Sequence, residues 1–126
     1  MTPDELDDDS KLIATVRKRI EAMPDKTIIT IYRNYGMSGA VSLSEKRSQI
    51  VTHEVFLAQM LKKARSTLGL TQYQMATVLG YEGKQRKQMC YDLETGRRPI
   101  REPQRRLVEQ YLIAHQCGCL PDSWPE

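Results

Sequence analysis

The sequence predicts a mainly α-helical protein with one small β-hairpin in its N-terminal part. Helices are favoured because apolar residues recur at spacings of three and four along several segments, and glycine or proline closes most of these segments. A hairpin is favoured by one stretch of β-branched and aromatic residues that precedes a turn-rich stretch. The 126 residues have room for one small domain with extensions.

The first predicted element is a helix over residues 10–22. Asp9 or Ser10 is a suitable N-cap, and Pro24 ends the run. The apolar side chains that follow helical spacing are Leu12, Ile13, Val16 and Ile20. Their spacing indicates one apolar stripe along this helix.

The predicted hairpin pairs residues 27–33 with residues 40–44, across a turn over residues 34–39. Because an isolated two-stranded hairpin is only marginally stable, it must pack on a helix or pair with another chain. Residues 1–50 are therefore interpreted as an N-terminal helix plus β-hairpin extension with two candidate roles, dimerisation and partner binding.

A second helix is predicted from Glu54 to Leu68, and Gly69 closes it. Its apolar stripe consists of Leu57, Met60, Leu61, Ala64 and Leu68. The regular spacing of this stripe indicates that one side of the helix is buried.

A short helix follows directly. Thr71 and Gln74 have the spacing of a capping box, and Leu70 and Met75 have that of the flanking hydrophobic staple. Gly80 is the signal for the end of the helix. The sequence therefore places both ends of this helix.

Two further helices complete the predicted fold. Residues 85–95 are helical by pattern, with Cys90 and Leu93 facing inward and Gly96 closing the helix. Pro103 suits the first turn of the last helix. The core stripe of that helix is Leu107, Val108, Tyr111 and Leu112.

The net charge of +3 hides an uneven distribution of charged residues. Residues 84–106 alone carry eight basic and three acidic side chains, a local charge of +5. Charge by itself favours a solvated helix face, and a phosphate-facing patch is the alternative. Local structure has to decide between the two.

Composition excludes several other classes of protein. No apolar run approaches the roughly 18 residues that a membrane span needs, and the acidic start lacks the features of a signal peptide. Three cysteines, an odd number, do not make a disulfide framework. We therefore expect a soluble, intracellular protein in a reducing cytoplasm, without a membrane association.

Two stretches carry a family resemblance. Residues 68–80 (LGLTQYQMATVLG) and residues 93–98 (LETGRR) resemble the Cro and lambda-repressor-like (XRE) helix-turn-helix family. The resemblance covers roughly residues 54–113. It departs from the family pattern at Met75, where a leucine is usual, and in the turn over residues 81–85, which is a few residues longer.

The resemblance implies a lambda-repressor-like helix-turn-helix bundle over residues 51–115, which binds DNA. Residues 1–50 extend it, and residues 116–126 are a C-terminal tail; the chain from residue 115 onward is expected to be irregular. The implied function is that of a bacterial or phage transcriptional regulator that binds double-stranded DNA in a sequence-specific way. The implied location is the cytoplasm of a bacterium, on its nucleoid, or a phage-infected host cell. The family's usual mode is a repressor that binds an inverted-repeat operator as a homodimer.

The resemblance also implies which side chains contact DNA. The second helix of the motif lies across the phosphate backbone, where Gln72 meets a phosphate, and the third enters the major groove. The expected DNA-binding residues are Gln72, Lys84, Gln85, Arg86, Lys87, Gln88, Tyr91, Arg97 and Arg98. Arg86, Lys87 and Gln88 are the favoured base readers, because arginine and lysine suit guanine and glutamine suits adenine.

Several of these assignments have alternatives. Gln85 and Gln88 equally suit a merely soluble helix, and Tyr91 is either a sugar or thymine contact or a lid over the core. Asp92 either pairs with a neighbouring arginine or accepts a hydrogen bond from cytosine. Glu94 matches the family's buried glutamate and is given a structural role.

Other functions are weaker alternatives. An antitoxin-like or phage operon autorepressor would use the N-terminal part to bind a partner protein, and an interaction module would use the basic face without specific DNA binding. Zinc ligation by His115, Cys117 and Cys119 with Cys90 and His53 lacks paired Cys-x2-Cys spacing. No catalytic residue, cofactor or metal is predicted, so the chain is not expected to be an enzyme.

Overall fold

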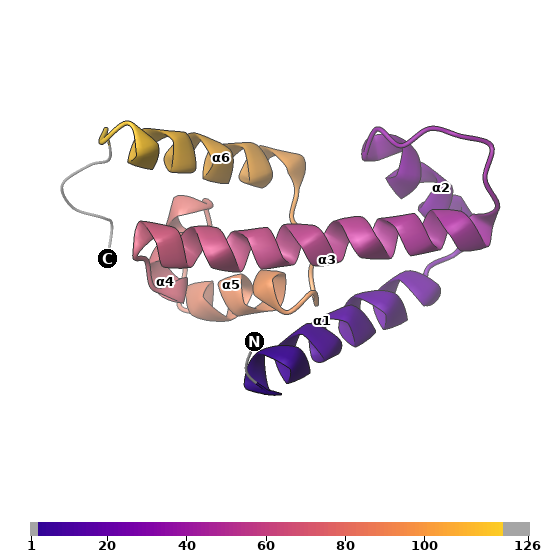
Figure 1. The fold of residues 1–126 in the computed structure, drawn as a ribbon, viewed down its shortest axis with the longest axis horizontal. Helices are drawn as coiled ribbons and strands as arrows, with labels where there is room; N and C mark the ends of the chain where they lie inside the picture. Colours follow the sequence, from indigo (N-terminus) through magenta and orange to yellow (C-terminus); the bar gives the residue numbers. More distant parts are fainter. Residues whose placement is uncertain (1–2, 120–126) are drawn as a thin grey trace. The chain divides into compact units, whose positions relative to one another are not determined.

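The structure, a computed structural model, describes residues 3–119 of the chain (Figure 1). These residues form six α-helices, and no strand occurs among them. The predicted mainly α-helical class is therefore confirmed. The chain divides into two compact units, Met1–Phe56 and Leu57–Glu126, and the division falls within one long helix.

The first unit contains helix α1 (Pro3–Glu21), helix α2 (Asp25–Asn34) and the first part of helix α3 (Leu43–Leu68). Helix α1 ends within one residue of the predicted end, but it starts seven residues earlier than residue 10. Its predicted apolar stripe is buried except for Ile13, which is 37% exposed.

The predicted hairpin is wrong. Residues 27–33 lie in helix α2, and residues 40–42 are irregular before α3 begins at Leu43. Helix α2 buries Ile28 and Tyr32, which are spaced four apart, whereas Ile29 between them is 40% exposed. Burial thus follows a helical period, because tertiary packing overrides the weak preference of β-branched residues for strands.

Polar contacts hold the helices of the first unit together. Arg47 of α3 donates from Nη2 to the Met23 carbonyl oxygen at 3.0 Å and to Asp25 Oδ1 at 2.7 Å, which fixes the α1–α2 connection. Arg19 of α1 pairs with the buried Glu54 of α3 at 2.5 Å. These contacts join α1 and the start of α2 to α3.

Tyr35 follows α2, and its ring lies 4.5 Å from that of His53, centroid to centroid. Burial, together with the negative charge of Glu54, raises the pKa of Tyr35 to about 12. The phenol therefore stays protonated further into alkaline solution than that of an ordinary tyrosine.

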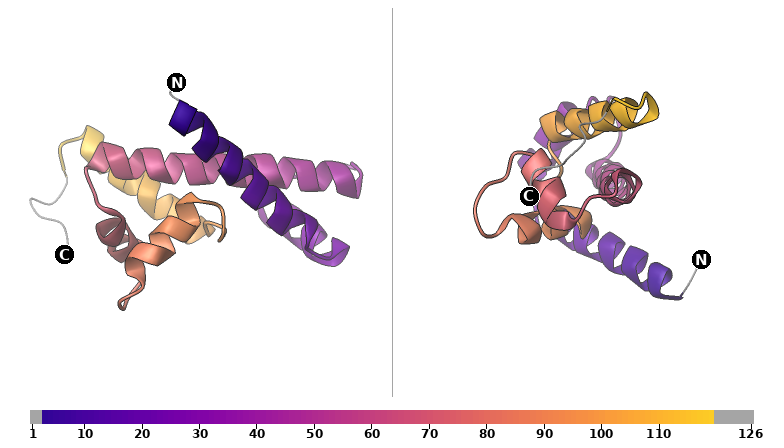
Figure 2. Two further views of the ribbon diagram at one scale, coloured as in Figure 1. Left: turned by 90° about the horizontal axis from the view of Figure 1, so that it is seen from below. Right: turned by 90° about the vertical axis from the view of Figure 1, so that its left-hand side faces the viewer.

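The second unit contains the rest of α3 with helices α4 (Gln72–Val78), α5 (Arg86–Glu94) and α6 (Glu102–Gln116). Figure 2 shows α4 and α5 as short neighbouring helices, and the loop between them curves away from both. The core of this unit receives side chains from all four helices and from the segments that connect them, namely Leu57, Leu61, Ala64, Leu68, Leu70, Met75, Ala76, Leu79, Cys90, Leu93, Ile100 and Val108. Helix α3 starts at Leu43, eleven residues before the predicted start.

The predicted limits of α4 are confirmed. Thr71 is the N-cap, and its Oγ1 accepts a hydrogen bond from the Gln74 backbone N–H at 3.1 Å. The Gln74 side chain accepts from the Thr71 backbone N–H at 2.9 Å, which completes the capping box. After the helix, Gly80 has a φ of +95°, a conformation that favours glycine.

Helix α6 has Pro103 in its first turn, as predicted. Of its expected core stripe, Val108 is buried and Tyr111 and Leu112 pack against the core, but Leu107 is only half-buried. The helix continues to Gln116, so the expectation of an irregular chain from residue 115 is wrong for its first two residues. Residues 120–126 of the predicted tail lie outside the described residues.

Candidate nucleic-acid interface

Helix α5 has one buried face and one exposed face. Cys90 and Leu93 point into the core of the second unit and are at most 1% exposed. Lys87, Gln88 and Tyr91 alternate with them and are exposed. The packing of one face therefore presents a polar, basic face to solvent.

A buried ion pair connects α5 to α3. Arg65 of α3 forms a fork with Glu94 of α5, through Nε to Oε2 at 3.0 Å and Nη2 to Oε1 at 3.1 Å. The Cys90 thiol also donates to Glu94 Oε2 at 3.0 Å. Glu94 is 7% exposed, so the structural role expected for it is confirmed.

Arg86 connects α5 to α4 and the loop between them. Its Nε donates to the Gly83 carbonyl oxygen at 2.9 Å, its Nη1 to Thr77 Oγ1 at 3.0 Å, and its Nη2 to the Tyr73 hydroxyl. The guanidinium carbon also lies 4.1 Å from the centroid of the Tyr73 ring, within cation–π distance. All three guanidinium nitrogens of Arg86 thus have partners inside the protein.

The C-terminal end of α5 folds the next residues back onto the helix. Gly96 has a φ of +81°, and the Arg97 backbone N–H donates to the Asp92 carbonyl oxygen at 2.9 Å, which is the Schellman pattern. This cap brings the side chains of Arg97 and Arg98 close to the Asp92 carboxylate. Arg97 Nη1 lies 3.9 Å from Asp92 Oδ1, and Arg98 Nε lies 3.6 Å from Asp92 Oδ2. The carboxylate also accepts from Gln88 Nε2 at 2.9 Å.

The nine predicted DNA-binding residues fall into two groups. Gln72, at the first position of α4, and Arg86 are half-buried. The other seven are exposed, and we call them the basic surface: Lys84, Gln85, Lys87, Gln88, Tyr91, Arg97 and Arg98. Within the described part of the chain, neither Lys84 nor Lys87 makes an ion pair with a carboxylate. These two ammonium groups are therefore available to a ligand.

Sequence reasoning missed two residues of this region. Tyr73 and Thr77 lie one helical turn apart on α4, and both accept hydrogen bonds from Arg86. Their helical spacing was visible in the sequence, but nothing in the sequence identified Arg86 as their common donor. Asp92, by contrast, pairs with neighbouring arginines, which confirms the first of its two expected roles.

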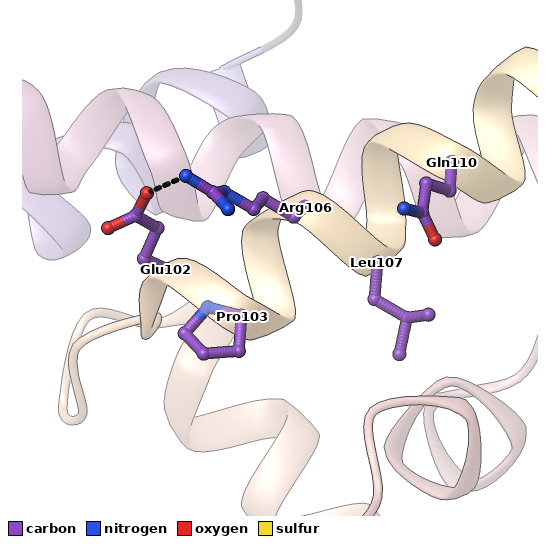
Figure 3. Close-up of a pocket in the computed structure, with 5 residues that line it drawn as sticks. All are labelled: Glu102, Pro103, Arg106, Leu107 and Gln110. Carbon is purple, nitrogen blue, oxygen red and sulfur yellow. Dashed lines mark hydrogen bonds and ion pairs between the residues drawn. The ribbon is translucent and has the colours of Figure 1, made fainter.

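The arginines of α6 differ from those that follow α5. Arg106 donates to Glu102 at 2.7 Å and Arg105 to Glu109 at 3.0 Å, so both pair with carboxylates of their own helix. Figure 3 shows the ion pair between Glu102 and Arg106. Both residues line a pocket of about 430 Å³. Pro103, Leu107 and Gln110 complete its lining.

The residues considered as zinc ligands are not gathered by the structure. Cys90 is buried beneath Glu94, and Cys117 and Cys119 are exposed at the end of α6. Among residues 3–119, no group of three or more histidine, cysteine, aspartate or glutamate side chains has the arrangement to hold a metal ion. In the same part of the chain, no helix combines the length and the apolar character of a membrane span.

Comparisons with known proteins return no relative. No family model, no curated protein and no solved structure matches this chain.

Proposed function

We propose that the chain is a sequence-specific, double-stranded-DNA-binding transcriptional regulator, in which α4 and α5 form a lambda-repressor-like helix-turn-helix. The observation that carries this proposal is the two-sided character of α5. One face is fixed by the core and by the Arg65–Glu94 fork, and the other presents the basic surface. A rigid helix with an exposed polar and basic face has the properties needed to read the major groove, which is about 12 Å wide.

In this proposal the residues of α5 have different tasks. Lys87 and Gln88 read bases, since both are exposed on the helix and suit guanine and adenine respectively. Tyr91 contacts a sugar or a thymine methyl group. Arg86 acts as a positioning residue, because its guanidinium already binds Gly83, Thr77 and Tyr73.

The remaining residues of the set bind the DNA backbone. Arg97 and Arg98 have exposed side chains, 60% and 54% respectively, in the loop after α5, and they meet phosphates. Phosphates are also contacted by Lys84 and Gln85, which precede α5, and by Gln72 at the start of α4. Such contacts fix the register of the protein on DNA, and they carry little sequence information of their own.

A homodimer on an inverted repeat follows from the small size of the surface. One unit offers few base contacts, and two recognition helices about 34 Å apart double them. Occupation of a promoter by such a dimer would repress transcription. We assign the dimer contact to residues 1–56, where Ile13, Ile29 and Phe56 are exposed.

A second candidate function is that of an antitoxin-like autorepressor. It is favoured by a pocket of about 510 Å³ in the first unit, lined by Met37, His53 and Phe56 together with polar residues of α3. Phe56 is 57% exposed there, a large apolar side chain that a partner protein would cover. In this version the second unit binds the operator and the first unit binds the partner.

The test is selection of duplexes from a random pool by the full chain, followed by a gel shift with the enriched sequence. We expect an enriched motif with two-fold symmetry and a complex that random competitor DNA does not displace. Lys87→Ala should weaken binding of the enriched duplex more than binding of random DNA. The matched control is Lys63→Ala, which removes an exposed charge from α3. Failure to enrich any sequence would refute the proposal.

A further inference from the structure

We propose that the Asp92 carboxylate lowers the affinity of the basic surface for all DNA by pairing with Arg97 and Arg98, and supports its sequence selectivity by orienting Gln88. The inference rests on the proposed function. Asp92 is the acidic residue nearest to the phosphate-binding arginines of that proposal, and its side chain is only 15% exposed. A negative charge at this position lowers the affinity of the surface for DNA, because it repels the phosphate backbone of every sequence.

The two arginine contacts are ion pairs of moderate length. Distances of 3.9 and 3.6 Å exceed the range of a good N–H···O hydrogen bond, and both arginine side chains are more than half exposed. Pairs of this kind contribute little to stability. Each arginine can therefore exchange Asp92 for a DNA phosphate, and the remaining carboxylate charge reduces the gain from that exchange.

The contact with Gln88 is a true hydrogen bond. Gln88 Nε2 donates to Asp92 Oδ1 at 2.9 Å, across one turn of α5. An ionised carboxylate only accepts hydrogen bonds, so the amide nitrogen must face it. This fixes the direction of the Gln88 amide before DNA binds, and a fixed amide distinguishes base edges better than a rotating one.

Asp92 thus has two effects on binding. Its charge weakens the attraction of the surface for all DNA, and its oxygen orients a base reader that contributes only on the right sequence. Asp92→Asn separates the two effects, because asparagine removes the charge and keeps an oxygen that accepts from Gln88. Asp92→Ala removes both the charge and the acceptor.

The experiment measures dissociation constants of the full chain for a mixed-sequence duplex and for the duplex enriched by selection, over a range of salt concentrations. For Asp92→Asn we expect binding to the mixed-sequence duplex to become about three- to tenfold tighter, with a salt dependence steeper by about one. The ratio of the two affinities should be retained. For Asp92→Ala we expect the same gain on the mixed-sequence duplex, but a ratio that falls about fivefold or more.

Two controls tie the gain to this carboxylate. Glu102→Gln also removes a carboxylate that pairs with two arginines, but on α6, and it should leave both affinities within about twofold. In a chain that already carries Arg97→Gln and Arg98→Gln, Asp92→Asn should give a clearly smaller gain, because the released arginines supply most of it. A gain of undiminished size in that chain, or an equal gain from Glu102→Gln, would overturn the proposal.

Loss of folding does not imitate the expected result, since an unfolded variant would bind no tighter. If Asp92→Asn binds the mixed-sequence duplex equally or more weakly, the inference fails while the proposed function stands. If the wild-type chain enriches no sequence but Asp92→Asn still binds tighter, sequence-specific regulation fails and the charge effect of Asp92 is supported. A wild-type chain that binds no DNA overturns both.

Discussion

Among the described residues of the second unit, Arg65 and Glu94 form the most buried ion pair, with side chains 21% and 4% exposed. Removing one partner of such a pair leaves the other charge in a poorly solvated site. Arg65→Met should lower the free energy of unfolding by about 3–5 kcal/mol, measured by urea denaturation followed by circular dichroism. Lys63→Met, on the exposed side of the same helix, should change it by less than about 0.5 kcal/mol. Equal effects of the two variants would contradict the role given to the fork.

Cys90 should differ from the other two cysteines in reactivity. Burial, followed by the hydrogen bond to Glu94, raises the pKa of the Cys90 thiol far above its usual range, so the thiol stays protonated even in mildly alkaline solution. Cys117 and Cys119 are exposed. With a chromogenic disulfide reagent on reduced protein, two thiols should react at once and the third only in denaturant. Prompt reaction of a Cys117→Ser, Cys119→Ser variant at pH 8 would refute this assignment.

The residues of the candidate site were predictable to different degrees. The exposure of Lys87 and Gln88 was predictable from helical period, because Cys90 and Leu93 mark the buried face of the same helix. Arg97 was predicted from its place in the loop that follows this helix. The environment of Arg86 did not, because its partners Tyr73 and Thr77 belong to another helix and no sequence rule pairs a donor with acceptors across a loop. Side-chain identity predicts what a residue can bind, and tertiary packing decides whether that capacity is already used.

The helices of the second unit were easier to predict than those of the first. The limits of α4 are set by local signals, namely the Thr71–Gln74 capping box and Gly80. Helix α2 lacks such signals, since its N-cap residue Pro24 makes no side-chain cap, and its β-branched residues favour a strand locally. The early start of α3 was missed because polar residues dominate its first turns, so no apolar stripe marks them.

The relation between α4 and α5 depends on Arg86. Lysine cannot reproduce a planar fork that binds three acceptors. Arg86→Lys should therefore lower the free energy of unfolding by about 1–3 kcal/mol and reduce discrimination between the selected and random duplexes. Lys87→Arg, at the next position, should leave stability within about 0.5 kcal/mol. If Arg86→Ala leaves stability unchanged and relaxes the choice at one base pair only, Arg86 is a base reader, as the sequence favoured.

The net charge of the molecule indicates a binding surface more clearly when cations that pair with carboxylates are distinguished from those that do not. Residues 84–106 carry a local charge of +5, but the carboxylates of Asp92, Glu94 and Glu102 all have arginine partners. The cations without a described carboxylate partner include Lys84 and Lys87 beside the exposed face of α5. Pairing therefore concentrates the uncompensated charge near the proposed base readers.

Removing residues 1–42 tests the role of the first unit while keeping helix α3 whole. We expect the full chain to sediment as a dimer. The shortened chain, which keeps only Phe56 of the three exposed contact residues, should sediment as a monomer and bind the selected duplex more weakly. Its affinity for a single half-site should be unchanged, because the basic surface lies in the second unit. If the shortened chain is still a dimer, the dimer contact does not lie in residues 1–42.

Helix α2 has a consequence for handling the protein. Its residues 27–32 (TIITIY) contain no charge and no proline, a composition typical of segments that form intermolecular cross-β structure when they are released. In the folded chain this segment is a helix with Ile28 and Tyr32 buried. Lys26 and Arg33 flank it as charged gatekeepers. We therefore expect partial unfolding of the first unit to promote aggregation through this segment, and substitutions that stabilise α2 to slow it.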